Sequence, residues 1–214
     1  MPDKVTPLRP RVEGEREEQI LDATVDLLLD VGYDRLTMDS VAARSKAGKA
    51  TLYRRWTSKQ RLVVDAVNRS KRAVIGPPPD TGSLRTDLVR CFSGPDAIVP
   101  AEAHRLLGVV MSALTTDPEF AAEFRTQFVL PRIGVMQEVY RRAAARGELR
   151  PDADLSIIGP ALAAVLLQRA LVLGEQITGP LVERVVDQVI LPAATGHAPA
   201  PTPPESASGR EEQS

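Results

Sequence analysis

Residues 37–59, TMDSVAARSKAGKATLYRRWTSK, constrain the fold of this chain more than any other stretch. Thr37 is a favourable N-cap, and apolar residues follow it at helical spacing, which predicts a short helix. A break at residues 45–48 separates this helix from a second short helix over about residues 49–55. Two short helices joined by a tight turn indicate a helix-turn-helix.

The second of these helices presents two different faces. Leu52 and Trp56 are four residues apart and are its largest apolar residues, so we expect both to point inward. At about 100° per residue, the opposite face consists of Ala50 and Arg54, flanked by Thr51 and Tyr53. A methyl group, a hydroxyl, a phenol and a guanidinium are groups that contact base edges and phosphates in a major groove. This pattern favours a DNA recognition helix.

Charge supports the same interpretation. Seven basic residues and no acidic residue lie between positions 40 and 64. Such patches neutralise phosphates, although a run of charge can also be only a solvated face. Ser58 is expected to cap the next helix and to place Lys59 against a phosphate. The predicted DNA-binding residues are Thr37, Arg44, Lys46, Lys49, Ala50, Thr51, Tyr53, Arg54 and Lys59.

Composition predicts an all-α protein with its positive charge at one end. Of the 214 residues, 43% are hydrophobic but only 4% are aromatic, and few stretches alternate as strands do. Residues 1–75 carry 15 Lys+Arg and 11 Asp+Glu, whereas the remaining 139 carry 12 and 17. The positive potential therefore lies with the predicted helix-turn-helix.

From residue 15 to about residue 75 the chain resembles the N-terminal domain of the TetR (tetracycline repressor) family. The resemblance is carried in order by the helix over 20–30, Gly32-Tyr33, Leu36-Thr37, Val41-Ala42-Ala43, the run from Gly48 to Trp56, and Ser58-Lys59. Two positions depart from the family pattern, which usually has Gly at Lys46 and often Ser or Thr at Gly48. Lys46 tolerates a left-handed backbone less well than Gly, so the departure bears on the conformation of the turn.

The remaining sequence divides the chain into segments. We predict a flexible arm over 1–13, the DNA-binding domain over 14–75, a helical second domain over 83–194 and a disordered tail over 195–214. Further helices are expected over about 15–31, 59–75, 83–92, 100–115, 117–147, 154–175 and 179–191. Pro131 interrupts the long helix over 117–147 and cannot donate to the carbonyl of Gln127, so a kink or local opening is expected there.

All four phenylalanines lie in the second domain, and an ordinary helical core would explain them. The resemblance implies instead an all-helical domain with an effector cavity, and an apolar or aromatic small molecule would suit such a wall. The candidate effector-binding residues are Phe92, His104, Leu107, Met111, Phe124, Gln127, Phe128 and Met136.

The last two predicted helices have long apolar faces that need to be covered. A two-fold four-helix bundle would cover them, and TetR-like proteins dimerise through their last two helices. The candidate dimer-interface residues are Leu162, Val165, Leu166, Leu173, Leu181, Val185 and Val189.

Several other classes of protein are disfavoured. A lone Cys91 excludes an intrachain disulfide and a cysteine zinc site, and only two histidines are present. We find no nucleophile elbow and no glycine-rich phosphate loop, so we expect no enzyme activity, no metal and no cofactor. No signal peptide and no long apolar span is evident, which favours a cytoplasmic protein without a membrane segment.

These observations favour a homodimeric transcriptional regulator that binds double-stranded DNA at a palindromic operator, most simply a ligand-released repressor. One alternative is a DNA-binding or architectural protein whose second domain only dimerises. A small helical enzyme with an appended basic domain is the third possibility.

Overall fold

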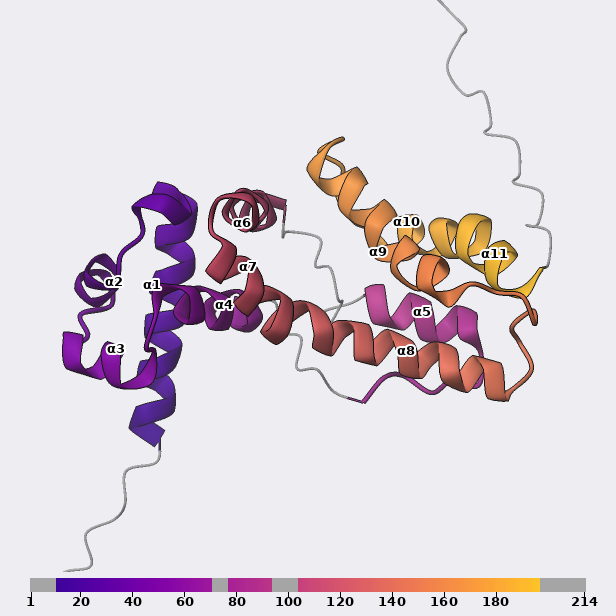
Figure 1. Cartoon of the computed structure of the whole chain (residues 1–214), viewed down its shortest axis with the longest axis horizontal. Helices are drawn as coiled ribbons and strands as arrows, with labels where there is room; N and C mark the ends of the chain where they lie inside the picture. Colours follow the sequence, from indigo (N-terminus) through magenta and orange to yellow (C-terminus); the bar gives the residue numbers. More distant parts are fainter. Residues whose placement is uncertain (1–10, 71–76, 94–103, 197–214) are drawn as a thin grey trace, which may run out of the picture.

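The computed structural model describes residues 11–70, 77–93 and 104–196, and these residues form helices and connecting turns (Figure 1). This confirms the predicted all-α fold. The bounds of the helices are α1 Arg11–Arg35, α2 Met38–Ser45, α3 Lys49–Arg55, α4 Lys59–Ser70, α5 Leu84–Phe92, α6 His104–Thr116, α7 Pro118–Phe124, the π-helical turn η1 Arg125–Val129, α8 Leu130–Ala145, α9 Leu155–Leu171, α10 Gly179–Val185, the π-helical turn η2 Val186–Ile190, and α11 Leu191–Thr195.

Helices α1 to α4 form the N-terminal end of the molecule. Gly32 has φ 79°, which stops the regular part of α1 as predicted, because this backbone conformation favours glycine. Helix α1 begins at Arg11, so residues 11–13 of the predicted arm are helical, and the rest of that arm lies outside the described residues. The predicted C-terminal end of α4 also lies outside them.

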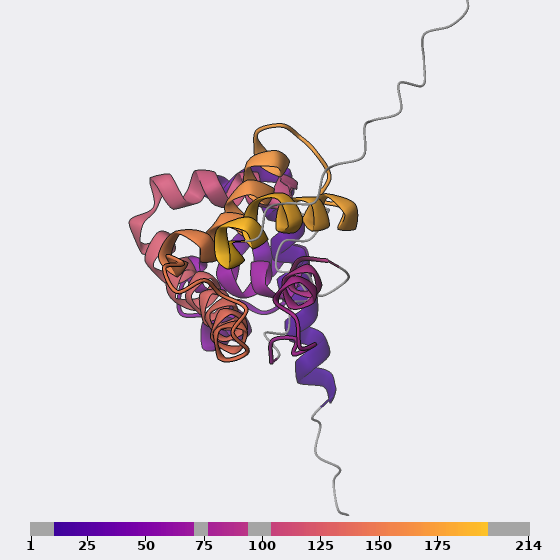
Figure 2. The ribbon, with the colours of Figure 1, turned by 90° about the vertical axis from the view of Figure 1, so that its right-hand side faces the viewer.

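Helices α6 and α7 pack against α1 and α4, so the buried core of the DNA-binding domain continues past the linker. Helix α8 then runs away from α4 toward α5 (Figure 1). Figure 2 shows α9, α10 and α11 as an orange and yellow layer over α5 and α8. The predicted domain boundary within 76–82 is therefore crossed by side-chain packing, and residues 71–76 are not described.

A π-helical turn precedes each of two prolines that lie within helices, Pro131 and Pro192. Pro131 follows η1, where the Leu130 N–H bonds to the Arg125 carbonyl, and Pro192 follows η2, where the Leu191 N–H bonds to the Val186 carbonyl. These five-residue bonds open the helix locally, because a proline cannot close the usual one. The predicted interruption at Pro131 is confirmed. The prediction that the last helix ends near Leu191 is wrong, since the helix continues past Pro192 to Thr195.

Candidate functional site

The first helix of the predicted helix-turn-helix is held by a reciprocal cap. The Ser40 N–H donates to Thr37 Oγ1 at 3.1 Å, and the Thr37 N–H donates to Ser40 Oγ at 3.0 Å. This satisfies two amides that a helix start otherwise leaves unpaired. The N-cap prediction for Thr37 is confirmed, and its hydroxyl serves α2 in this structure. A DNA contact by Thr37, which is exposed, stays a prediction.

The turn between α2 and α3 passes through Lys46 in the left-handed conformation, with φ 54°. The Ala47 N–H donates to the Ala42 carbonyl at 3.0 Å, which completes a helix-ending motif that usually places glycine at the position of Lys46. The Arg16 guanidinium donates to the Lys46 carbonyl. Lys46 thus adopts the strained backbone that its departure from the family pattern suggested.

Two buried side chains hold helix α3 against the rest of the domain. Leu52 is 0% exposed and Trp56 is 1% exposed, as predicted, and Trp56 Nε1 donates to Asp65 of α4 at 2.9 Å. We define the recognition face as the four exposed side chains Lys49, Ala50, Tyr53 and Arg54. Thr51 is half-buried beside them. The burial of Leu52 and Trp56 fixes which way these four side chains point.

Basic residues around the recognition face are partly engaged in ion pairs. Arg44 lies 2.9 Å from Asp30, Lys49 lies 2.8 Å from Asp39 and Arg55 lies 2.8 Å from Glu17. The hydrogen bond from Lys49 to Asp39 raises the pKa of that lysine. Such exposed pairs contribute little to stability, so a phosphate can replace the carboxylate. Arg54 makes no ion pair with any described residue.

Lys59, which was predicted to meet a phosphate, lies in the first turn of α4 and has a partner within the chain. Its Nζ donates to the Tyr33 carbonyl at 2.9 Å and lies 4.0 Å from the centre of the Tyr33 ring. Burial lowers the pKa of this half-buried lysine, and nearby Asp117 and Asp34 oppose that effect. In this arrangement Lys59 links α4 to the end of α1. A phosphate contact by Lys59 stays a prediction, because its ammonium has three N–H donors and the Tyr33 carbonyl takes one of them.

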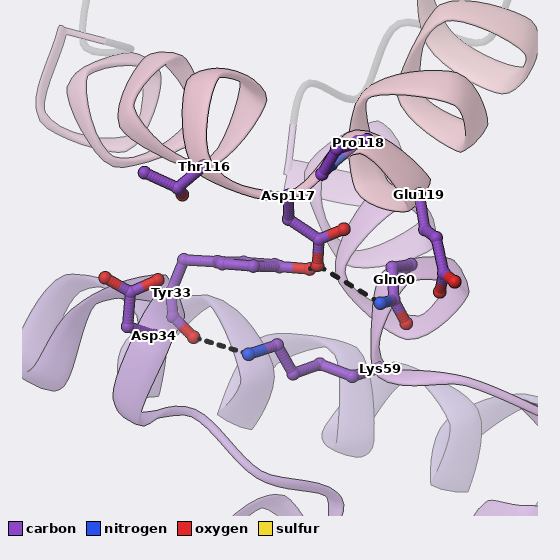
Figure 3. A pocket seen from close by; sticks show the side chains of 8 residues that line it. All are labelled: Tyr33, Asp34, Lys59, Gln60, Thr116, Asp117, Pro118 and Glu119. Atoms are coloured by element: carbon purple, nitrogen blue, oxygen red, sulfur yellow. Dashed lines mark hydrogen bonds between the residues drawn. The ribbon is translucent and has the colours of Figure 1, made fainter.

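The same lysine lines a cleft of about 600 Å³ between the DNA-binding domain and the start of α7 (Figure 3). Tyr33 Oη donates to Asp117 Oδ2 at 2.6 Å, and Gln60 Nε2 donates to the same oxygen at 3.1 Å. Asp117 Oδ1 accepts from the Phe120 N–H at 2.9 Å and so caps α7. We name Tyr33, Lys59, Gln60 and Asp117 the junction, because they join α1, α4 and α7.

The pKa of Tyr33 is raised at the junction, whereas the pKa of Asp117 is lowered. Burial, together with the hydrogen bond to Asp117, raises the pKa of Tyr33. Burial also raises the pKa of Asp117, but hydrogen bonds from Tyr33, Phe120 and Gln60 outweigh it and the pKa is lowered. At neutral pH the junction is therefore a phenol that donates to a carboxylate. No pattern in the sequence marked Tyr33 and Gln60 as partners of Asp117.

A column of aromatic rings leads from the junction along α7 and η1. The ring centres of Tyr33 and Phe120 are 4.8 Å apart, those of Phe120 and Phe124 are 5.7 Å apart, and those of Phe124 and Phe128 are 4.5 Å apart. The guanidinium carbon of Arg132 lies 3.5 Å from the centre of the Phe128 ring. Packed rings transmit small displacements because protein interiors are dense.

The carbonyl that Pro131 leaves without a helical partner is not free. Gln127 O accepts from Asn68 Nδ2 of α4 at 3.3 Å. Gln127 stays a predicted effector-binding residue. The hydrogen bond from Asn68 joins α4 to the second domain at the interruption.

The other candidate effector residues do not lie in one buried cluster. Phe124 and Phe128 are buried in the core that includes the DNA-binding domain, with Met111 packed against it. Phe92, Leu107 and Met136 are buried in a second core with α5, α9 and α10. His104 begins α6, and its side chain lies outside the described residues. The predicted set thus flanks the boundary between two cores.

Comparison with known proteins agrees with this geometry. Residues 20–66 match the model of bacterial regulatory proteins of the tetR family, and residues 78–189 match the tetracyclin repressor-like C-terminal domain. An uncharacterised HTH-type transcriptional regulator of Mycobacterium tuberculosis is 36% identical over 189 residues, covering 88% of this chain and 93% of that protein. The DNA-binding transcriptional repressor TetR of Mycobacteroides abscessus is 32% identical over 176 residues, covering 82% of this chain and 92% of that protein.

The chain belongs to the TetR family. It is a helix-turn-helix transcriptional regulator, and this family consists of regulators rather than enzymes. The crystal structure of TetR family transcription regulator SCO0332 is 28% identical with a TM-score of 0.56, covering 82% of this chain and 97% of that one. Salmonella enterica GusR shares the fold at 17% identity with a TM-score of 0.62, covering 88% and 99%.

Four of the seven residues predicted to form a TetR-like dimer interface are buried within the chain itself. Leu162, Leu166, Leu181 and Val185 are buried in the chain's own second core, so a partner cannot reach them in this structure. Val165 is half-buried. Leu173 and Val189 are exposed, as are Leu155, Ile157 and Val172. These five exposed residues come from the start of α9, the segment after it and η2, and we use the name apolar outer face for them as a set.

Three further features of the described residues concern membrane spans, metal sites and the one cysteine. No helix among the described residues is long and apolar enough to cross a membrane. Within the same part of the chain, no group of His, Cys, Asp and Glu side chains is arranged to hold a metal ion. Cys91 is buried, and this burial raises the pKa of its thiol to about 11, which makes it a poor nucleophile.

Proposed function

We propose that this TetR-family regulator is a homodimeric repressor that binds a palindromic operator in the cytoplasm and is released from it by a small molecule. The observation that carries the proposal is the recognition face, four exposed side chains held on a buried Leu52 and Trp56. A relative named as a DNA-binding transcriptional repressor supports repression rather than activation.

One chain presents one recognition helix, and a palindrome requires two. The apolar outer face supports a symmetric dimer, since Ile157 is 68% exposed and Val172 is 73% exposed. Two-fold pairing of this face would cover it and would set the two α3 helices for half-sites about 34 Å apart.

Release of the operator would act through α4, which packs against α1 of the DNA-binding domain and against α7 and η1. Arg61 lies 2.9 Å from Glu123, and Asn68 bonds to the Gln127 carbonyl. Gln60 bonds to Asp117 at the other end of the same interface. A ligand that moved α7, η1 or α8 would displace α4 and change the separation of the two recognition faces, which is an allosteric coupling between two sites.

Selection of bound sequences from random DNA, followed by a screen for small molecules that release the selected site, tests the proposal. We expect a palindromic consensus, and we expect Arg54→Ala to weaken binding by about 1–3 kcal/mol. Binding to a palindrome that no small molecule reverses would indicate a regulator whose second domain only dimerises. Absence of any selected sequence would contradict the proposal.

The dimer is tested separately on the apolar outer face. Val172→Glu would bury an unpaired carboxylate against its symmetric copy, so sedimentation should show a monomer and operator binding should collapse. Val185→Glu is unsuitable for this purpose, because Val185 is buried within its own chain and the change would unfold it. Glu183→Gln, on an exposed part of α10, serves as the control. A wild-type protein that sediments as a monomer at micromolar concentration would contradict the proposed dimer.

A further inference from the structure

Arg132 is one of two charged side chains that are buried in the part of the chain that the structure describes, and Asp87 is the other. Asp87 accepts two hydrogen bonds from Thr81 at 2.7 Å and lies 3.4 Å from Arg146. Arg132 is only 8% exposed and forms no ion pair with any described residue. A buried charge without a counter-charge destabilises a fold, so Arg132 requires an explanation that Asp87 does not.

The hydrogen bonds of Arg132 occupy one end of its guanidinium. Nη1 donates to the Phe128 carbonyl at 2.8 Å and to Asn68 Oδ1 at 3.2 Å. Nε and Nη2 are buried and have no partner among the described residues. These two nitrogens form one edge of the planar group, and their N–H bonds point in the same direction.

That edge binds carboxylates elsewhere in this chain. Nε and Nη2 of Arg85 donate to the two oxygens of Asp187 at 2.7 and 2.8 Å. The same pair of nitrogens on Arg141 donates to the two oxygens of Glu138 at 2.6 Å each. Paired, charge-assisted hydrogen bonds of this kind are strong and specific for planar oxyanions. Arg132 presents the same edge, buried and unpartnered.

The surroundings of Arg132 fit a ligand with an apolar body. Phe128 and Met136 lie four residues to either side on the same helical face, and Phe128 stacks against the guanidinium. Phe128 belongs to the core shared with the DNA-binding domain and Met136 belongs to the second core. Arg132 therefore lies at the boundary that the candidate effector residues flank.

Arg132 is charged at neutral pH despite its burial. Desolvation lowers the pKa of its guanidinium to about 10, which is still well above 7. A bound carboxylate would restore the interactions that the charge loses on burial.

We propose that Arg132 is the anion-binding group of the effector site and that the effector is a small organic acid, with an apolar or aromatic body and a carboxylate that accepts from Nε and Nη2. This inference rests on the proposed function, since it names the class of the effector. The site also reaches α4, because Asn68 contacts both the Arg132 guanidinium and the Gln127 carbonyl.

Calorimetric titration of the full chain without DNA tests the inference. The probes are benzoate, 1-naphthoate and octanoate, each measured beside its neutral primary amide. We expect at least one acid to bind the wild-type protein about tenfold or more tightly than its amide. Arg132→Met should remove this preference, and Arg132→Lys should reduce it, because lysine keeps the charge but lacks the two-pronged edge.

Arg141→Met is the matched control. It removes an arginine of the same helix whose edge is already occupied by Glu138, so the preference for the acid should persist. Thermal melts of each variant verify folding. The inference is overturned if all three acids bind no better than their amides, if none binds at millimolar concentration, or if the preference survives Arg132→Met.

Operator release measured by fluorescence anisotropy separates this inference from the proposed function. Acids that bind through Arg132 without releasing the operator would uphold the anion site and contradict ligand-released repression. Neutral compounds that release the operator, combined with failure of all acids to bind, would uphold repression and contradict the anion site.

Discussion

The recognition face and the junction are both polar surfaces of the DNA-binding domain, but their residues come together in different ways. The recognition face lies within Lys49–Arg54 and rests on residues of the same short helix. At the junction, Tyr33 bonds to an aspartate 84 positions away, and Gln60 reaches the same residue across 57 positions. The comparison shows that the surface proposed to read DNA is encoded locally, whereas the contact proposed to transmit a ligand signal depends on the packing of both domains.

The largest expected effect is at the base of the recognition face. Trp56→Ala removes a fully buried ring and its hydrogen bond to Asp65, and should destabilise the protein by about 3–5 kcal/mol. Urea denaturation measures this loss, and operator binding should fail at temperatures where the wild type binds. Trp56→Phe keeps most of the ring and should retain much of the stability. If Trp56→Ala bound the operator normally, the recognition face would not depend on this anchor.

The same chemical change in two tyrosines compares the two regions directly. Tyr33→Phe removes a hydrogen bond to a carboxylate and should lower the free energy of unfolding by about 1.5–3 kcal/mol. Tyr53→Phe, at a side chain that is 52% exposed, should leave stability unchanged and weaken only DNA binding. Denaturation and operator titrations of both variants measure the contrast. Equal stability losses would show that the two regions are not distinct.

The turn within the recognition motif should show a smaller effect of opposite sign. Lys46→Gly relieves a left-handed backbone and should stabilise the protein by about 1 kcal/mol. Lys46→Ala removes the same charge but keeps the strain, so it isolates the electrostatic part. A melting temperature for Lys46→Gly no higher than that of Lys46→Ala would rule out strain at this position.

Acidification should reduce the contribution of the junction to stability, and this effect should be smaller than the three above. The folded pKa of Asp117 is lowered, so its stabilising contribution is complete above the ordinary value of 3.8 and is lost as pH falls through the folded pKa. The difference in stability between the wild type and Asp117→Asn should therefore shrink from pH 7 to about pH 3. A difference that stayed constant across this range would show that ionisation of Asp117 does not matter.

The sequence predicted those features that depend on near neighbours. Thr37 as a cap, Leu52 and Trp56 as anchors, and the interruption at Pro131 all follow from rules that span one or two helical turns. Partners such as Asn68 for the Gln127 carbonyl are not predictable in this way, because they require the relative placement of α4 and η1.

The dimer-interface prediction was wrong for four of its seven residues, and for a different reason. Helix α9 carries apolar residues around most of its circumference, so spacing alone cannot say which face meets the chain's own core and which faces outward. Arg132 did carry a signal that could have been used, since it is a charged residue at helical spacing between Phe128 and Met136 on an apolar stripe.

A π-helical turn has a consequence for the phase of the helix that contains it. Such a turn holds one residue more than an α-helical turn, which rotates everything after it by about 100°. In the rod formed by α7, η1 and α8, Phe120 contributes to the core of the DNA-binding domain and Val139 contributes to the second core. Deleting a single residue from Arg125–Val129 would rotate α8 relative to α7 by about 100° about the helix axis. Such a deletion would damage both cores, although it removes no residue of the recognition face.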